Sequence, residues 1–388
     1  MVGGLNLRPV ASDRPAPSAG AGGVSAPAGA RGPGMGDAKV DTRSREDPVE
    51  QVYDARIRGV CLISTRAGGR MHLHGGCWVT AASHQPPRLL VAFPKEFEGA
   101  DIVQKGGDFA VSLVADDQVG LNDALFSGRQ SLDALGRHRW LRAPSGCPVL
   151  RDGVGYFDCR LAEAVDLGDF LLAVGDLRAA AILWPDKRNL TVNAIQRRDT
   201  GGQPILPLHG FDDDGGDLAA APVEGADARV LEAVYGRRQW GLFLVTAHAG
   251  GVTHLHVGCW AIQCSHQPPR MLVCIDRHLP AADLVRASGR FALSLLAEDQ
   301  LPVAVRVVGG ATVPEALTGV RFRSLGEGLP VLDDAVAHFL CSVEGEFNAG
   351  ADHAGFYGPV LDFGWGRRDA PQLRDDQLMA AWGATNGG

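Results

Sequence analysis

Residues 72–88 read HLHGGCWVTAASHQPPR, and residues 254–270 repeat most of them as HLHVGCWAIQCSHQPPR. The match continues without a gap over about 100 residues, far longer than the unit of a solenoid repeat. The same spacing pairs Tyr53 with Tyr235, Phe109 with Phe291, Cys159 with Cys341, and the Pro-Val-Leu of residues 148–150 with that of residues 330–332. The chain therefore contains one domain twice, named here copy one and copy two.

Composition agrees with two globular domains and narrows the class of partner. The chain has 388 residues, of which 45% are hydrophobic and 21% charged, as in ordinary globular proteins. Its net charge of -8 comes without a basic block, which argues against nucleic-acid or anionic-membrane partners. Apolar runs such as residues 89–93 are too short to span a membrane. We therefore expect small-molecule partners.

The eight cysteines and the N-terminus indicate where the protein works. The cysteines lie in apolar runs without the CxxC spacing of zinc sites, which is typical of reduced, buried thiols. The N-terminus lacks a positive segment followed by an apolar stretch, so it does not resemble a secretory signal. Both features predict a cytoplasmic protein.

Changes in composition set the predicted domain boundaries. Residues 1–47 are rich in Gly, Ala and Pro and are predicted to be a disordered leader. The Gly- and Asp-rich residues 199–228 are predicted to be a flexible linker. Copy one then spans residues 48–198, copy two residues 229–370, and a C-terminal tail residues 371–388.

Within each copy, β-branched and aromatic runs bounded by Gly and Pro predict strands. In copy one these are residues 59–65, 76–83, 88–93, 109–115, 156–165 and 170–179, and short helices are expected at 48–58, 100–105 and 119–126. Many strands with few helices predict a mainly β domain that closes into a small barrel. We expect the two copies to form separate barrels packed against each other.

The order of these features resembles the flavin reductase-like family of FMN-binding split β-barrels. The shared elements are a small-residue and Trp segment, Ser-x-x-Pro-Pro, an apolar strand, a Phe-Ala-Val-Ser-Leu strand, a Pro-Val-Leu turn and a hairpin containing Gly-Asp. The resemblance covers residues 51–195 and again 233–368. It implies two tandem split barrels.

The resemblance also implies the cofactors and partners. Family members hold FMN, or FAD, and use NAD(P)H as a transient co-substrate, so no dinucleotide-binding GxGxxG is needed. Hydride passes to the flavin and on to free flavin or another small molecule, and a partner monooxygenase is one recipient of reduced flavin. Family barrels pair, which predicts an internal pseudo-dimer of the two copies with composite sites.

Cofactor-binding residues follow from the family motif, position by position. A phosphate needs backbone N–H groups and small hydroxyl side chains at close approach. In copy two, Val257, Ile262 and Cys264 crowd that segment, so we expect flavin chiefly at copy one. The candidates are Gly75, Gly76, Cys77, Trp78, Thr80, Ala82 and Ser83 of copy one, and Gly258, Cys259, Trp260 and Ser265 of copy two.

The family hairpin Gly-Asp-His supplies the first catalytic candidate. Copy one carries Gly-Asp-Phe at residues 168–170, whereas copy two keeps the histidine as His353. His84 and His266, which precede the double prolines, complete the candidates for proton transfer near neutral pH.

The doubled His-x-His leaves a second interpretation open. His72 and His74 alternate along an extended segment and point to one face, as do His254 and His256. With His84 and His266 they would give three imidazoles per copy, enough for a catalytic metal site. The alternatives to a flavin enzyme are therefore a metal- or haem-dependent enzyme on the same barrel, or a duplicated binding protein without catalysis.

Overall fold

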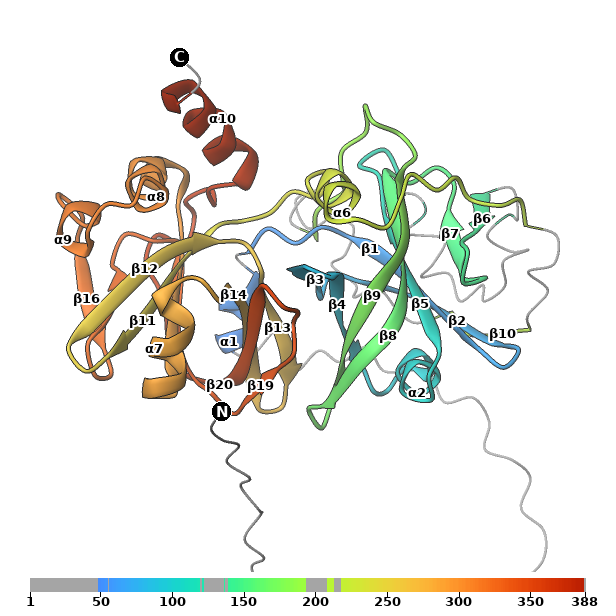
Figure 1. Ribbon diagram of the computed structural model, residues 1–388, viewed down its shortest axis with the longest axis horizontal. Coiled ribbons are helices and arrows are strands. Elements are labelled where there is room, and N and C mark those ends of the chain that lie inside the picture. The colour runs from blue at the N-terminus through green and yellow to red at the C-terminus, as the bar shows by residue number, and fades with distance from the viewer. Residues whose placement is uncertain are drawn as a thin grey trace, which may run out of the picture. The chain divides into compact units, whose positions relative to one another are not determined.

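The structure is a computed structural model that describes residues 48–54, 56–118, 121, 136, 139–192, 208–212 and 218–386 (Figure 1). The predicted leader and all but one residue of the predicted helix 119–126 lie outside these ranges. Both copies belong to one compact unit.

Copy one is built on one antiparallel sheet. Its elements are α1 (Pro48–Asp54), β1 (Cys61–Ala67), β2 (Arg70–Gly76), β3 (Val79–His84), β4 (Pro87–Pro94), α2 (Glu98–Gln104), β5 (Asp108–Leu113), β6 (Trp140–Arg142), β7 (Pro148–Leu150), β8 (Gly155–Asp166), β9 (Phe170–Ile182) and β10 (Leu208–Asp212). Eight strands pair in the order β10-β2-β1-β5-β8-β9-β4-β3, and β6 pairs with β7.

Copy two repeats this arrangement. Its elements are α6 (Ala228–Tyr235), β11 (Phe243–Ala249), β12 (Val252–Gly258), β13 (Ala261–His266), β14 (Pro269–Asp276), α7 (Pro280–Ser288), β15 (Arg290–Leu295), η4 (Glu298–Gln300), α8 (Leu301–Val308), α9 (Val313–Ala316), β16 (Phe322–Leu325), β17 (Leu329–Leu332), β18 (Ala337–Ser342), β19 (Gly345–Phe347), β20 (His353–Trp365) and α10 (Asp375–Asn386). The strand order is β12-β11-β15-β18-β20-β14-β13, with β19 beside β20.

Matched hydrogen bonds confirm that the two sequences fold alike. Ser64 Oγ donates to the Pro148 carbonyl at 2.8 Å, and Thr246 Oγ1 donates to the Pro330 carbonyl at 2.9 Å. These bonds fix the two Pro-Val-Leu segments, β7 and β17, in equivalent places. In the described part of copy one the outer strands β10 and β3 do not pair with each other, so the sheet is not hydrogen-bonded into a closed ring.

The predicted strands of copy one are all present within a few residues of their expected ends. Strand β2, which contains the first His-x-His, was not among the predicted strands. It forms a hairpin with β1, and His72 and His74 pair with Thr65 and Ile63. The Gly68-Gly69 turn permits this hairpin because both residues have positive φ, which glycine adopts without strain.

The two copies exchange their first helices. Val52 and Tyr53 of α1 are buried in the core of copy two, where the Tyr53 ring stacks on Phe339 at 5.0 Å. In return, Val234 and Tyr235 of α6 lie in the core of copy one. The expectation of two separate barrels is corrected here, because each hydrophobic core is completed by the other copy. The internal pairing of the copies follows directly.

The expected linker at 199–228 is ordered wherever the structure describes it. Strand β10 pairs with β2, and the amide of Ala221 donates to the Arg142 carbonyl at 2.8 Å. Tyr156 Oη donates to the Pro222 carbonyl at 2.7 Å. The C-terminal tail is likewise part of copy two, since Leu373 is fully buried and α10 follows it. The described residues of both segments therefore pack against the two copies, and the domain boundaries stay predictions.

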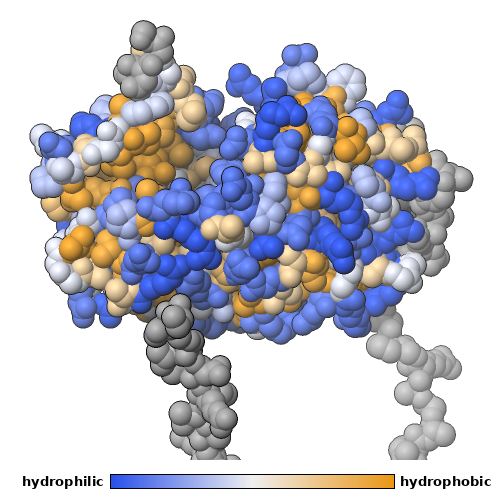
Figure 2. All heavy atoms as spheres, in the orientation of Figure 1, coloured by the Kyte–Doolittle hydropathy of each residue, from blue (hydrophilic) through white to orange (hydrophobic). Residues whose placement is uncertain are grey.

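The surface of copy two carries apolar side chains near α10 (Figure 2). Val252 of β12, Val308 of α8 and Phe322 of β16 are exposed large hydrophobic residues of this copy. None of the helices described is long and apolar enough to cross a membrane.

Candidate functional site

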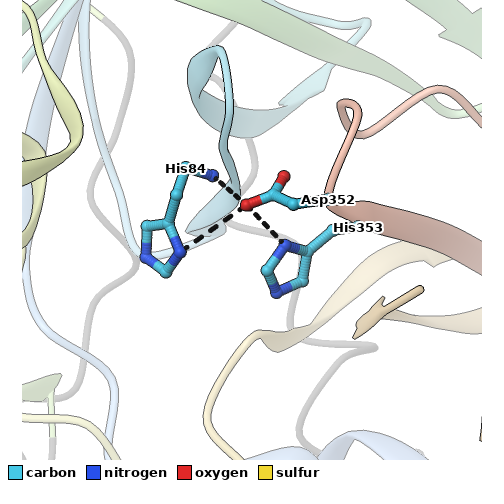
Figure 3. Close-up of side chains that lie close together, drawn as sticks. All are labelled: His84, Asp352 and His353. Carbon is cyan, nitrogen blue, oxygen red and sulfur yellow. Dashed lines mark hydrogen bonds and ion pairs between the residues drawn. The ribbon is translucent and has the colours of Figure 1, made fainter. Parts of the chain in front are cut away.

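The interface between the two copies, called the seam below, brings together His84, Asp352 and His353 (Figure 3). His84 ends β3 of copy one, His353 begins β20 of copy two, and Asp352 directly precedes that strand. Asp352 Oδ2 accepts a hydrogen bond from the His84 amide at 3.0 Å. The same oxygen lies 3.7 Å from His84 Nδ1 and 3.2 Å from His353 Nδ1. We call these three residues the His84–His353 cluster.

Side chains from both copies surround this cluster. The half-buried Trp260 ring lies 4.7 Å from the His84 ring and 4.5 Å from the His353 ring. Glu232 of α6 approaches His84 Nε2 at 3.1 Å. His84 is 31% exposed and His353 12%, so the imidazoles are reachable from solvent but largely sheltered. The cluster therefore joins a flat aromatic surface to two groups that can carry protons.

Electrostatics keep the carboxylate charged and one imidazole neutral. Burial alone would raise the pKa of Asp352, but hydrogen bonds from Ser83 Oγ and the His84 amide, with His353 nearby, lower its pKa to about 2. Burial lowers the pKa of His353, although Asp352 opposes this shift. Asp352 Oδ2 lies 3.2 Å from His353 Nδ1, so a neutral His353 that keeps its proton on Nδ1 has Nε2 as its proton-accepting nitrogen.

The opposite side of the seam contains the equivalent cluster with one change. Asp169 accepts hydrogen bonds from Ser265 Oγ at 2.6 Å and from the His266 amide at 2.7 Å. Phe170 occupies the place of His353, and its ring lies 5.0 Å from His266. This His266–Phe170 cluster has the same backbone scaffold, but it contains one imidazole where the other contains two.

The predicted flavin segment of copy one is almost fully buried. Of its seven candidates Trp78 is half-buried and the other six are buried. Thr80 Oγ1 is hydrogen-bonded to Tyr235 Oη at 2.9 Å, and Ser83 Oγ donates to Asp352 at 2.5 Å. Both hydroxyls expected to serve a phosphate are therefore used between the copies. Strand β10 also covers the backbone edge of β2 just before this segment.

The segment of copy two is more accessible. Gly258, Cys259 and Trp260 are all half-buried, and β12 pairs only with β11 among the described strands, which leaves one backbone edge without a strand partner. A Cβ at Gly258 would meet only the His256 ring, at 3.7 Å, so this position is not crowded. Ser265 is buried, and its hydroxyl donates a hydrogen bond to Asp169. Gly258, Cys259 and Trp260 are therefore more accessible than their counterparts Gly76, Cys77 and Trp78 as a group, because Gly76 and Cys77 are buried.

Neither His-x-His pair belongs to these clusters, although His256 is close enough to His353 for the two charges to interact. His72 and His74 are fully buried beneath α2, where their rings approach Phe97. Burial lowers the pKa of His74 well below its usual value, so this imidazole is neutral. Among the described residues, the only group of three or more candidate ligands at metal-binding spacing is His84, Asp352 and His353. Neither His-x-His pair joins His84 or His266 in such a group.

Several residues of the site were not among the candidates chosen from the sequence. Asp352 and Asp169 hold the Ser-His segment of the opposite copy, and Tyr235 and Glu232 reach the site from the exchanged helix α6. The Gly-Asp hairpin was a usable signal for the two aspartates. Nothing in the sequence indicated that α6 contacts the other copy.

Comparison with known proteins gives the family. The model of the "Flavin reductase like domain" matches residues 55–198 and 236–379. The actinorhodin polyketide dimerase of Streptomyces coelicolor is 32% identical over 157 residues, covering 40% of this chain and 87% of that protein. Putative diflavin flavoprotein A 5 of Nostoc sp. is 29% identical over 159 residues, which are 40% of this chain but only 27% of that protein.

A solved structure is similar over part of the chain. Nitrilotriacetate monooxygenase component B from Mycobacterium thermoresistibile is 27% identical, with a TM-score of 0.32, and the match covers 35% of this chain and 75% of that one. The family assignment depends on the two domain matches, which together span more than half of the chain and coincide with its two copies. This chain belongs to the flavin reductase like family, with one such domain in each copy.

Proposed function

We propose that this protein is an NAD(P)H-dependent flavin oxidoreductase whose flavin, FMN or FAD, lies at the seam beside Trp260. The observation that carries the proposal is the His84–His353 cluster, which two flavin reductase like domains build jointly. A bound flavin would supply the hydride chemistry, which side chains cannot perform. The electrons would pass to free flavin or to another small molecule.

The residues of the cluster have distinct roles in this proposal. His353 exchanges a proton at Nε2, and Asp352 fixes its orientation through Nδ1. His84 lies between Asp352 and the exposed Glu232. Its imidazole can therefore pass protons between the Asp352 carboxylate and solvent. Trp260 provides the flat apolar surface against which an aromatic ring packs.

The site near copy two is favoured over the one near copy one. Gly258, Cys259 and Trp260 lie in an accessible segment next to the only seam cluster that contains a second imidazole. The expectation that flavin binds chiefly at Gly75–Ser83 remains a prediction that burial argues against. Gly75, Gly76, Cys77 and Ala82 then serve as packing residues.

The test combines a spectrum with turnover. Purified protein, with added FMN if needed, should show a flavin absorbance spectrum and oxidise NADH or NADPH. The variant His353→Phe copies the His266–Phe170 cluster, and it should retain flavin while turnover falls by about 10²- to 10⁴-fold, the usual contribution of a proton-transferring side chain. His278→Phe alters an exposed histidine and serves as the control. A colourless protein without flavin affinity would refute the proposal.

A metal-dependent enzyme is the second candidate, because two imidazoles and a carboxylate are the donor set of many catalytic metal sites. In this case the His84–His353 cluster, and not the His-x-His pairs, would hold the ion. A metal count on the same sample decides between the candidates. One zinc or iron per chain that is lost in Asp352→Asn, without flavin, would favour the metal enzyme.

The family membership also suggests a biological partner and a location. Nitrilotriacetate monooxygenase component B is, as its name says, one component of a monooxygenase. By analogy, we propose that reduced flavin made here passes to a partner monooxygenase and that the protein works in the cytoplasm. Coupled turnover with a candidate monooxygenase from the same genome would test this.

A further inference from the structure

A segment between the two copies covers one side of copy one. Its first part, β10, pairs antiparallel with the outer edge of β2, where Leu208 lies opposite Leu73 and Phe211 opposite Met71. This pairing satisfies backbone groups that an edge strand would otherwise leave open. We call β10 and residues 218–221, which are parts of this segment that the structure describes, the covering segment.

The covering segment also packs between β2 and β6. The amide of Arg142 in β6 donates to the Ala219 carbonyl at 2.8 Å. Leu218 belongs to one hydrophobic cluster with Met71 and Trp140. Met71 and Trp140 are each only 2% exposed. In copy one this surface of the domain therefore binds an extended segment, through backbone hydrogen bonds and apolar contacts.

In copy two the equivalent surface is open. The repeat places Thr253 where copy one has Met71, and Phe322 where copy one has Trp140. Thr253 is half-buried, and Phe322 is 46% exposed. In the part of the chain that the structure describes, β12 pairs only with β11 and β16 only with β17. No described strand therefore takes the place of the covering segment here.

This open surface contains a cavity between β12, α9, β16 and β17, which we call the copy-two groove (Figure 1). Its volume is about 390 Å³, within the range of about 300–1,000 Å³ that is typical of ligand pockets. Leu317, Phe322 and Pro330 line it, and Thr253 lines it on the side of β12. Among the described residues, none that lines the groove is charged. The groove therefore favours a large apolar side chain.

The free edge of β12 offers the backbone groups that an incoming strand needs. Two glycines join β11 to β12, and Ala249 pairs with Val252 across this turn. The pair that closes a two-residue hairpin exchanges hydrogen bonds, and such pairs alternate along the strands. The N–H and C=O groups of Thr253 and Leu255 therefore point away from β11. The side chains of these two residues share one face of β12, because they are two positions apart.

We propose that the copy-two groove and the free edge of β12 bind an extended peptide segment of a partner protein, which adds a strand to the sheet as β10 does in copy one. The segment carries large apolar residues opposite Leu255 and Thr253, as β10 carries Leu208 and Phe211 at the equivalent positions of β2. Residues directly opposite each other in an antiparallel pair lie on the same face. The side chain opposite Thr253 therefore enters the groove. The site lies at the end of β12 away from Gly258 and requires no flavin.

The probe is a fluorescein-labelled synthetic peptide with the sequence of residues 204–222, titrated with the full chain and followed by fluorescence anisotropy. One peptide should bind per chain, with a Kd below about 1 mM. The peptide variant Phe211→Asp should bind at least about tenfold more weakly, because its carboxylate would enter an uncharged groove. Absence of saturable binding overturns the proposal.

Variants of the chain show where the peptide binds. Thr253→Pro removes one outward N–H group from β12, and proline is tolerated on an edge strand whose N–H faces solvent. This variant should weaken binding by about tenfold through the lost hydrogen bond. Its matched control is Thr253→Val, which also loses the hydroxyl that is hydrogen-bonded to His248 Nδ1 at 2.8 Å. Because Thr253→Val keeps the N–H, it should bind the peptide as the wild type does.

A second pair of variants tests the groove itself. Phe322→Glu places a charge in its wall and should weaken binding, whereas Leu361→Glu alters an exposed apolar residue outside the groove and should not. If Thr253→Pro fails to fold, this pair decides. Binding that no groove variant weakens overturns the proposal, because the peptide then lies elsewhere, as it would if it displaced the covering segment. Self-association that Phe322→Glu abolishes, without peptide binding, would assign the groove to a second copy of the chain and overturns it too.

Discussion

Individual imidazoles that folding partly removes from water make folding sensitive to acid. Burial, with His254 nearby, lowers the pKa of His256 to about 3, whereas an unfolded histidine titrates near 6.5. The unfolded chain therefore takes up the proton first, and stability falls as pH drops from about 6.5 towards 3. Above this window His256 is neutral in both states and has no effect on the pH dependence.

We predict that His256→Gln reduces the stability lost between pH 7 and pH 5 by about 1–2 kcal/mol. Urea unfolding at the two pH values measures this loss. His278→Gln, which changes an exposed histidine, should leave the difference unchanged. An identical loss in wild type and His256→Gln would show that folding does not shift the pKa of His256.

Single glycines distinguish the two candidate flavin segments. In Gly258→Val the new side chain would enter the accessible segment next to Trp260, where a Cβ meets nothing closer than 3.7 Å. We expect folding to be retained and bound flavin to fall at least tenfold, measured by absorbance of the purified protein. Gly75→Val alters a buried position and should change stability more than flavin content. The reverse pattern would restore the assignment to copy one.

At the level of elements, the first helix of each copy packs in the hydrophobic core of the other copy. Tyr53 stacks on Phe339 in copy two, so Tyr53→Ala should cost about 3–5 kcal/mol, as large-to-small core changes do. Hydrogen exchange should accelerate first in β15 and β18, which belong to copy two, although the mutation is in the sequence of copy one. Faster exchange confined to copy one would contradict the observed exchange of helices.

Much of this element structure could be predicted from the sequence, because it depends on local patterns. The alternation of β8 and the apolar run of β4 are visible in one copy, and the repeat transfers them to the other. The exchange of α1 and α6 could not be predicted. A helix carries the same apolar face whichever core it fills, so the pattern around Tyr53 contains no information on which copy receives it.

In the candidate site, too, the individual residues could be predicted from the sequence but their contacts could not. His84 and His353 could be chosen from the sequence because imidazoles near a double proline and a Gly-Asp hairpin stand out. Their proximity depends on how two domains pack, which no local pattern encodes. The burial of Thr80 and Ser83 could not be predicted for the same reason, because their hydroxyls form hydrogen bonds with Tyr235 and Asp352 of the opposite copy.

For the whole molecule, the shared cores imply that neither copy is stable alone. Copy one without α6 would expose the pocket filled by Val234 and Tyr235, and copy two without α1 would lose Val52 and Tyr53. Aspartates from each copy also hold the Ser-His segment of the other. Unfolding of either copy therefore removes part of the core of its neighbour.

We predict that the full chain unfolds in a single calorimetric transition, with equal calorimetric and van't Hoff enthalpies. Tyr53→Ala and Tyr235→Ala should each lower this one melting temperature without splitting it, because a defect in either core destabilises both copies. Tyr235→Phe keeps the ring but removes the hydroxyl bonded to Thr80, and should shift the transition much less. Two separate transitions, with each variant moving only one of them, would show that the copies fold independently despite exchanging helices.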